Sequence, residues 1–432
     1  MTTATPSVES AVLELYDKFP HEPAFRQINE TGAIRFGALG FPGKKHEMFT
    51  FVNFREFRAE KFEYIAGPLK MPTKDEIKNL VYAGCEKSIV VMVDGRFSGA
   101  LSDLTAHDGK ITATELSPDS VDLSNVQNES DAFACINSLF LTGGVKVEVK
   151  EGRRTDLPVE ILHLSTGGGA TGGKIPAYVP RVDIKMSADS KAVIVTKFCG
   201  AGGPYFVNGV CNAELDETAE LDLGMIQADP SDSWHFFKTY STQKKNSKLN
   251  IVCATNGGKL VRRNFECRLR GEGAALALLG LAILDGAEQA HNFVRVHHES
   301  PGCQSWEHYK NILNGKAVAS VDTTVTVHPG AQLAGSQQLI NNLMFSPTAR
   351  ADSKPRLMIH ADDVKCKHGA TVGRIDENQI FYLMSRGLSE SAAKGMIITG
   401  FAKSVIDAIP FAPAAADAGA LLLGKLGGTQ IG

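Results

Sequence analysis

The 432-residue sequence predicts a mainly β protein with a helical segment at each end. From about residue 88, short runs recur in which every second residue is apolar, the pattern of strands that bury one face. Gly, Asn and Asp separate these runs, and helices of the length that a βαβ unit needs are nearly absent between them. The runs are VKVEVK (145–150), VDIKM (182–186), AELDL (219–223), FECRL (265–269), FVRVH (293–297) and VDTTVTV (321–327).

Such a succession of strands is compatible with a sandwich, a barrel or a β-solenoid. The region is long for a single sandwich, whereas a solenoid gains length by adding turns. No clear sequence repeat is visible. The length therefore favours a solenoid, and the pattern alone leaves the other two folds open.

The N-terminal segment, residues 1–87, is predicted to be helical and mixed. Apolar residues recur at helical spacing from Ser7 to Lys18. Thr73 and Glu76, after Pro72, have the spacing of a capping box that opens a short helix. The β region is then expected to span residues 88–372, and a C-terminal helical segment to span residues 373–432.

Two helices are predicted in that C-terminal segment. Asp376 is placed to cap the first, and Gly387 to end it. Ser389 opens the second, which ends before Pro410. Two helices of this size cannot bury their apolar residues by themselves, so we expect a partner to bind here. The candidate partner-binding residues are Phe381, Met396, Ile397 and Phe401.

Composition excludes several classes of protein. Apolar residues make up 43% and charged residues 22% of the chain, as in globular proteins. A net charge of -3 and the lack of a Lys/Arg block give no indication of nucleic-acid binding. The apolar runs 274–284 and 418–423 are too short to span a membrane. The first twenty residues do not resemble a secretion signal, and the eight cysteines contain no CxxC, so a cytoplasmic protein with reduced thiols is expected.

The glycine-rich stretch STGGGATGGK (165–174) comes closest to a phosphate-binding loop. However, Ile175 stands where the Mg²⁺-binding Ser or Thr is needed, and Pro176 and Pro180 interrupt the helix that should follow. We therefore interpret it as a glycine-rich loop and expect the chain to bind no nucleotide. No motif of a hydrolytic enzyme is present, and no catalytic residue is predicted.

Cys366 and His368 are the candidate metal ligands, in the stretch ADDVKCKHGATVG (361–373). On an extended segment both side chains leave the same face. If the strand continues unbroken from Leu357, that face is directed away from the core. Thiolate and imidazole suit iron, zinc or a cluster, but a closed site needs four ligands, so the others would come from another subunit. An incidental pair at a domain edge remains the alternative.

His297 and His298 form a second candidate pair, with Glu299 and Cys303 nearby. Adjacent residues on a strand point to opposite faces, which makes the two histidines poor joint ligands. We interpret them as surface or lightly buried residues.

From Leu269 to Phe401 the sequence resembles the SufD subunits of the SufB/SufD family, which belongs to the Suf iron–sulfur cluster assembly machinery. The segment GFPGKKHEMFTFVNF is similar to the N-terminal segment of that family, although Met48 and Phe49 depart from its usual pattern. The remaining blocks that carry the resemblance are LRGEGAALALLGLAIL (269–284), VHHESPGCQS (296–305), KPRLMIHADDVKCKHGATVGRID (354–376) and QIFYLMSRGLSESAAKGMIITGF (379–401).

The resemblance implies a right-handed parallel β-helix flanked by helical segments. It implies a paralogous partner, SufB, at the end of the β-helix and an ABC-type ATPase, SufC, on the C-terminal helices. It also links His368, with Cys366 beside it, to cluster assembly at the subunit interface. The iron or iron–sulfur cluster would be held transiently and shared with the partner.

The expected function is therefore a non-enzymatic scaffold subunit of a SufBCD-type complex, which contributes to iron acquisition and nascent cluster formation. One alternative is a SufB-like paralogue that acts as a homodimeric scaffold, since a homodimer is possible when the chain is alone. Another is a β-solenoid metalloenzyme that uses Cys366 and His368. A carbohydrate-active solenoid is less well supported, because the chain has two tryptophans, Trp234 and Trp306, and no paired-acid motif.

Overall fold

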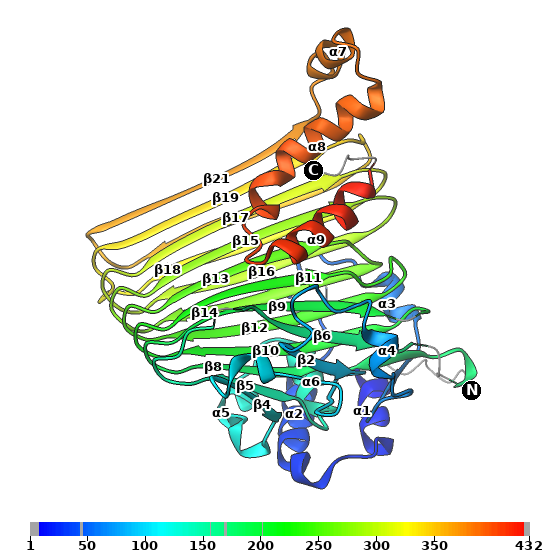
Figure 1. Cartoon of the computed structure of the whole chain (residues 1–432), viewed down its shortest axis with the longest axis vertical. Helices are drawn as coiled ribbons and strands as arrows, with labels where there is room; N and C mark the ends of the chain where they lie inside the picture. Colours follow the sequence, from blue (N-terminus) through cyan, green and yellow to red (C-terminus); the bar gives the residue numbers. More distant parts are fainter. Residues whose placement is uncertain (1–7, 44–45, 156, 168–170, 201, 427–432) are drawn as a thin grey trace.

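The computed structural model describes residues 8–43, 46–155, 157–167, 171–200 and 202–426. It is a parallel β-solenoid of about seven turns with helices at both ends (Figure 1). The prediction of a solenoid flanked by helices is confirmed, and each of the six alternating runs falls on a strand.

Two sheets face each other, and from β8 onward successive strands alternate between them, so that two strands make one turn. Within the described residues, sheet A contains eleven strands: β1 (Phe62–Tyr64), β4 (Ile111–Glu115), β5 (Val145–Val149), β7 (Ile175–Tyr178), β8 (Arg181–Met186), β10 (Phe206–Leu215), β12 (Trp234–Gln243), β14 (Leu260–Leu269), β16 (Gln289–His298), β18 (Val318–Val327) and β20 (Arg350–Ile359). In the same part of the chain, sheet B contains ten strands: β2 (Ile89–Val93), β3 (Arg96–Phe97), β6 (Val159–Ser165), β9 (Lys191–Gly200), β11 (Glu220–Gln227), β13 (Lys248–Thr255), β15 (Ala275–Leu284), β17 (Gln304–Leu313), β19 (Ala334–Met344) and β21 (Val364–Arg374).

The main core lies between the two sheets, in the space that we call the lumen. Strands pair in parallel from turn to turn, so residues of one column share the same environment. Val294 and Val296 of sheet A and Leu276 and Leu278 of sheet B belong to this core. Alternate residues of each strand face the lumen, which is why the period-2 pattern is visible in the sequence.

Elements of the N-terminal segment, together with α6 (Ala132–Leu139), build a second apolar core rich in phenylalanine, which packs against strands of sheet A. Phe133, for example, lies edge-on to Phe236 of β12, with ring centroids 4.3 Å apart. The predicted capping box at Thr73 and Glu76 is present. The helices described before residue 174 are α1 (Val8–Lys18), η1 (Pro23–Phe25), α2 (Arg26–Leu39), η2 (Glu47–Phe49), α3 (Arg55–Ala59), α4 (Lys74–Ile77), η3 (Thr105–His107), η4 (Pro118–Ser120), α5 (Leu123–Gln127), α6 (Ala132–Leu139) and η5 (Thr171–Gly173).

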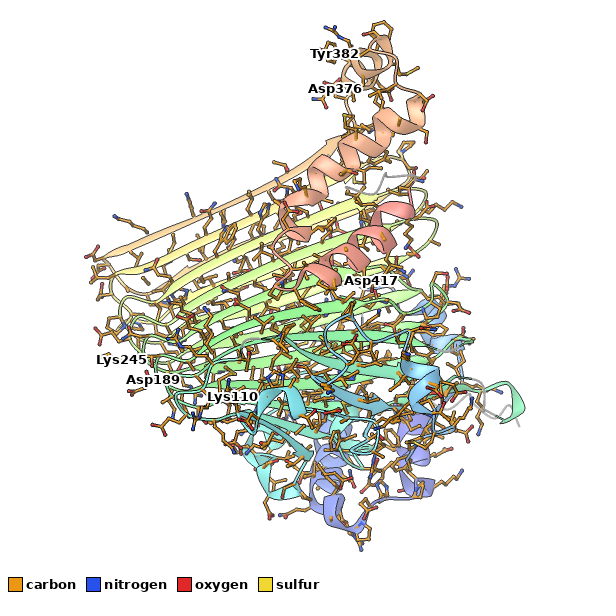
Figure 2. All side chains as sticks on the ribbon, in the orientation of Figure 1. Lys110, Asp189, Lys245, Asp376, Tyr382 and Asp417 are labelled. Carbon is orange, nitrogen blue, oxygen red and sulfur yellow. The ribbon has the colours of Figure 1, made fainter. Side chains whose placement is uncertain are left out.

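At the C-terminal end, α7 (Glu377–Ser385), α8 (Glu390–Ile406) and α9 (Ala412–Gly424) follow the last strand. The predicted caps are confirmed: Asp376 accepts from the Asn378 amide at 2.9 Å, and Ser389 accepts from the Ala392 amide at 3.2 Å. Both α8 and α9 pack against the outer face of sheet B. An ion pair of 2.9 Å between Lys197 of β9 and Asp417 of α9 joins the last helix to the sheet. Figure 2 shows Asp376 and Tyr382 on the part that projects beyond the solenoid.

In the part of the chain that the structure describes, none of the helices is both long enough and apolar enough to cross a membrane.

Candidate functional site

The last turn of the solenoid, which we call the end turn, consists of β20 and β21. These strands are the edges of sheets A and B. No further turn stacks on them within the described residues, and most side chains of β21 are exposed. The end turn therefore offers one row of backbone groups from each sheet and, between them, the uncovered end of the main core, which we call the mouth of the lumen.

Cys366 and His368 both lie on the lumen side of β21. Their register partners on β19, Ser336 and Gln338, are buried, and Cys366 packs against the main core. Burial raises the pKa of the Cys366 thiol, whereas the His368 side chain is exposed at the mouth. The expectation that this face is directed away from the core is wrong, because the strand from Leu357 ends at Ile359 and a new strand starts at Val364.

The residues that precede Cys366 and His368, Lys365 and Lys367, leave the opposite face of β21. With Trp306 they line an open outer groove of 510 Å³, whose described lining contains no Asp or Glu. The acidic pairs that a carbohydrate-processing cleft requires are not found there.

Cys366 and His368 are two ligands of a site that needs more. Within the described residues, no group of three or more His, Cys, Asp or Glu side chains is arranged to hold a metal ion. The pair can contribute one thiolate and one imidazole at the mouth of the lumen, so a ligand supplied from outside this chain would have to complete the coordination of iron.

Below this pair the lumen is polar, a feature that the sequence analysis did not identify. In one column, Ser305 and Ser336 lie beneath Cys366; in the next, Glu307 and Gln338 lie beneath His368. One turn further down, the same columns continue with leucine, at 276 and 278. The signal in the sequence was present, since polar residues occupy positions 305, 307, 336 and 338 where the alternation calls for apolar ones.

Hydrogen bonds connect these buried groups. Ser305 Oγ donates to Ser336 Oγ at 3.0 Å and lies 2.9 Å from the Nε2 atom of His298. His298 is fully buried, so the interpretation of both histidines as surface or lightly buried residues is wrong for His298, and this burial lowers its pKa to about 4. His297 is only partly buried, so the two adjacent histidines do point to opposite faces as predicted.

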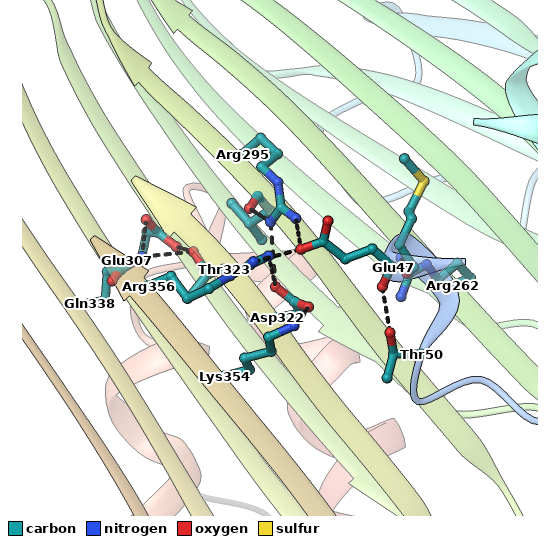
Figure 3. Close-up of polar contacts among 12 residues, drawn as sticks. Glu47, Thr50, Arg262, Arg295, Glu307, Asp322, Thr323, Gln338, Lys354 and Arg356 are labelled. Atoms are coloured by element: carbon teal, nitrogen blue, oxygen red, sulfur yellow. Dashed lines mark hydrogen bonds and ion pairs between the residues drawn. The ribbon is translucent and has the colours of Figure 1, made fainter. Parts of the chain in front are cut away.

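Glu307 lies in the same lumen and is completely buried. It accepts hydrogen bonds from the Thr323 hydroxyl and from Gln338 Nε2, the latter at 3.4 Å (Figure 3). Burial raises the pKa of Glu307 to about 7, because loss of solvent disfavours the charged form by more than the hydrogen bonds from Thr323 and Gln338 and the charge of Arg295 favour it.

We expect Glu307→Gln to stabilise the protein at pH 8 and to have little effect at pH 5. The pKa of Glu307 is raised in the folded state, so folding favours the protonated form; the stability that this contributes is complete below about pH 4.5 and is lost as the pH rises to about 7. The gain at pH 8 should reach about 3 kcal/mol. Chemical denaturation at both pH values measures it.

The difference between variant and wild type isolates Glu307, because Glu160, whose pKa is also raised to about 7, is present in both proteins. Glu217→Gln, at an exposed position, is the matched control. An equal change in stability at both pH values would contradict the prediction.

The N-terminal segment reaches the end turn along the outer face of sheet A through η2 (Glu47–Phe49). Glu47 of η2 pairs with Arg356 of β20 at 2.6 Å, and Arg356 also pairs with Asp322 of β18 at 3.2 Å (Figure 3). Arg262 donates to the Met48 carbonyl at 2.5 Å. Met48 and Phe49, the residues that depart from the family pattern, thus lie where the N-terminal segment contacts sheet A.

The candidate partner-binding residues occupy different environments. Phe381 and Met396 are 73% and 52% exposed, and Tyr382 and Met384 add further exposed apolar area on α7. Ile397 is half-buried. Phe401 is half-buried too; it packs against the cluster between α8 and sheet B, with the Lys310 ammonium 5.0 Å from its ring centre.

The glycine-rich stretch falls partly outside the described residues, which omit 168–170. After it, Ile175 begins strand β7, whereas a P-loop continues into a helix at this point. Lys174 pairs with Glu63 at 3.8 Å.

Comparison with known proteins relates the chain to a known family. Residues 169–401 match the model described as "SUF system FeS cluster assembly, SufBD core domain". The chain is 28% identical to the iron–sulfur cluster assembly protein SufD of Escherichia coli (strain K12), over 86% of each protein. It is also 28% identical to an iron–sulfur cluster assembly SufBD family protein of Synechocystis, over 87% of this chain and 85% of the relative. A SufBD family protein of Mycobacterium bovis is 31% identical over 64% of this chain and 68% of the relative.

Proposed function

The chain belongs to the SufBD family of iron–sulfur cluster assembly proteins, and on this basis we propose that it is a non-enzymatic scaffold subunit of a SufBCD-type complex. It contributes to iron acquisition and to nascent cluster formation at the interface with a SufB-like paralogue. The iron or cluster is the cargo of this assembly and is shared with the partner only transiently.

The observation that carries the proposal is the end turn. Both sheets end there in an edge strand, mostly half-buried in β20 and mostly exposed in β21, and Cys366 and His368 lie on the lumen side of β21. A second solenoid that pairs with these edges would bring its own side chains over the mouth and complete the coordination of iron. A homodimer of this chain is the other arrangement that the same edges allow.

The three expected segments have separate roles in this proposal. Residues 88–372 provide the β-helix and the shared site, residues 1–87 brace its outer face, and residues 373–432 bind an ABC-type ATPase. Phe381, Tyr382, Met384 and Met396 support the last assignment, because a pair of helices that exposes four large apolar side chains is typical of a binding surface. The ATPase supplies the nucleotide chemistry. The eight free thiols, seven of them buried, are consistent with a protein of the reducing cytoplasm.

Co-expression of the chain with a SufB-like protein and a SufC-like ATPase tests the proposal. We expect a complex that contains all three proteins, and a visible absorption spectrum of an iron–sulfur cluster after anaerobic reconstitution of that complex. The chain alone should bind iron weakly. Failure to form the complex, or a complex whose reconstitution yields no cluster, would contradict the proposal.

We also expect the isolated chain to have no ATPase activity. Ile175 cannot ligate Mg²⁺, and β7 takes the place of the helix whose N-terminus would bind phosphate. A phosphate-release assay on the purified chain measures this. Hydrolysis above background that disappears in Lys174→Ala would show that the glycine-rich loop binds nucleotide after all.

A further inference from the structure

Gln338 lies directly beneath His368 in the lumen. The two residues are register partners on adjacent strands, and Gln338 is buried while His368 stands at the open mouth. Three residues of β21 face this part of the lumen, Cys366, His368 and Ala370. Of these, only the imidazole carries a strong N–H donor.

The amide of Gln338 is held by its nitrogen. Nε2 donates to Thr323 Oγ1 at 3.0 Å and to Glu307 Oε1 at 3.4 Å, and the Thr323 hydroxyl in turn donates to Glu307 (Figure 3). Because both acceptors bind the nitrogen, the orientation of the carboxamide is fixed. Neither of them can donate a hydrogen bond to its oxygen at the same time.

That oxygen, Oε1 of Gln338, is buried and has no hydrogen-bond partner among the described residues. A buried carbonyl without a donor is unfavourable, and such groups are uncommon in folded proteins. On one side of Gln338, Glu307 of β17 contacts the nitrogen of this amide. On the other side, β21 carries His368.

We propose that Gln338 is a positioning residue for His368: its Oε1 accepts the N–H of the imidazole while the other ring nitrogen binds iron. Histidines that bind metals usually donate their second N–H to an oxygen acceptor, which selects the tautomer and fixes the ring. Thr323 and Glu307 act one step further away, by orienting the Gln338 amide. This inference rests on the proposed function, since it concerns the iron site at the end turn.

The test is an anaerobic Fe²⁺ titration of the complex that contains the full chain and its co-expressed partners. Gln338→Met keeps the length of the side chain and removes the acceptor, so we expect Fe²⁺ to bind roughly 10–100-fold more weakly. Gln338→Glu keeps an oxygen acceptor for the imidazole but loses the Nε2 donor that Thr323 and Glu307 hold, so it should bind Fe²⁺ more tightly than Gln338→Met and more weakly than the wild type. Gln337→Met, on the outer face of the same strand, is the matched control and should bind Fe²⁺ like the wild type.

A double-mutant cycle distinguishes positioning from a general effect on the fold. If Gln338 acts through His368, then Gln338→Met should cause no additional loss in a His368→Ala background. If Gln338→Met does not fold, the isosteric change Thr323→Val loosens the same amide. It should weaken Fe²⁺ binding in the same direction, by a smaller factor, and again only while His368 is present.

Wild-type affinity in a folded Gln338→Met complex would overturn the inference. So would an equal loss with and without His368. In both cases, weak binding by His368→Ala itself would leave the proposed function standing. Normal Fe²⁺ binding by His368→Ala would show that His368 has a structural role only, and the role of Gln338 would fall with it.

Discussion

Replacing His368 by alanine is expected to leave the fold and the heterodimer intact while the complex loses its capacity to bind iron and assemble clusters. The side chain is exposed and its ring makes no hydrogen bond within the described part of the chain, so its removal creates no cavity. Outer-shell partners of metal ligands alone contribute about 10–100-fold in affinity, so loss of a direct ligand should weaken Fe²⁺ binding by roughly a hundredfold or more.

Circular dichroism and size-exclusion chromatography check the fold and the heterodimer, and iron per complex and the rate of cluster formation check the site. His360→Ala is the matched control, because His360 is an exposed histidine of the same end turn. Cys366→Ala should have a similar or smaller effect, since Cys366 is partly buried against the core and could be either a ligand or a neighbour. Normal cluster assembly by His368→Ala would show that Cys366 and His368 have a structural role only.

Loss of ATPase binding is the second large effect, expected for the double change Phe381→Glu and Met396→Glu. Both side chains are more than half exposed, so the charges should not disturb α7 or α8. Each large apolar side chain buried at an interface contributes about 2 kcal/mol, so the pair should weaken the ATPase interaction roughly a thousandfold. Co-purification and a binding titration measure this.

Ile34→Glu is the control for that experiment. Ile34 is 77% exposed, but it lies on α2, at the opposite end of the solenoid from α7 (Figure 1). A double variant that retains the ATPase at wild-type levels would place the binding surface elsewhere.

Phe401 is a less suitable position for this test than the sequence indicates. Phe401→Glu is still expected to abolish co-purification, but the ring is half-buried and Lys310 Nζ donates to the Phe401 carbonyl at 2.7 Å. A charge there would also disturb the contact between α8 and sheet B. Only a variant with an unchanged unfolding temperature would report on the ATPase alone.

Much of the fold follows from local patterns. The alternating runs identify strands because a strand between lumen and solvent must alternate, and Asp376, Ser389 and Thr73 identify helix starts because the first amides of a helix need side-chain acceptors. These signals depend on neighbours within a few residues. They could therefore be interpreted correctly without knowing which strands pair.

The candidate site depends on contacts between turns. Ser305 and Ser336 are 31 residues apart in the sequence yet hydrogen-bonded in the lumen. No local pattern shows that positions 307, 338 and 368 form one column, because the column exists only once the register of three strands is set. The polar lumen was consequently not predicted.

The sequence by itself determined that the protein is mainly β with helical ends, that Cys366 and His368 share one face of a strand, and, through its resemblance, the family to which it belongs. Only the tertiary structure decided which way that face points. The chain turns between Ile359 and Val364 and enters the opposite sheet. The strand face on which Leu357 lies therefore does not predict the face on which Cys366 lies. The physical reason is that a strand's period of two fixes which residues share a face, whereas the connections between strands decide whether that face meets the core or the solvent.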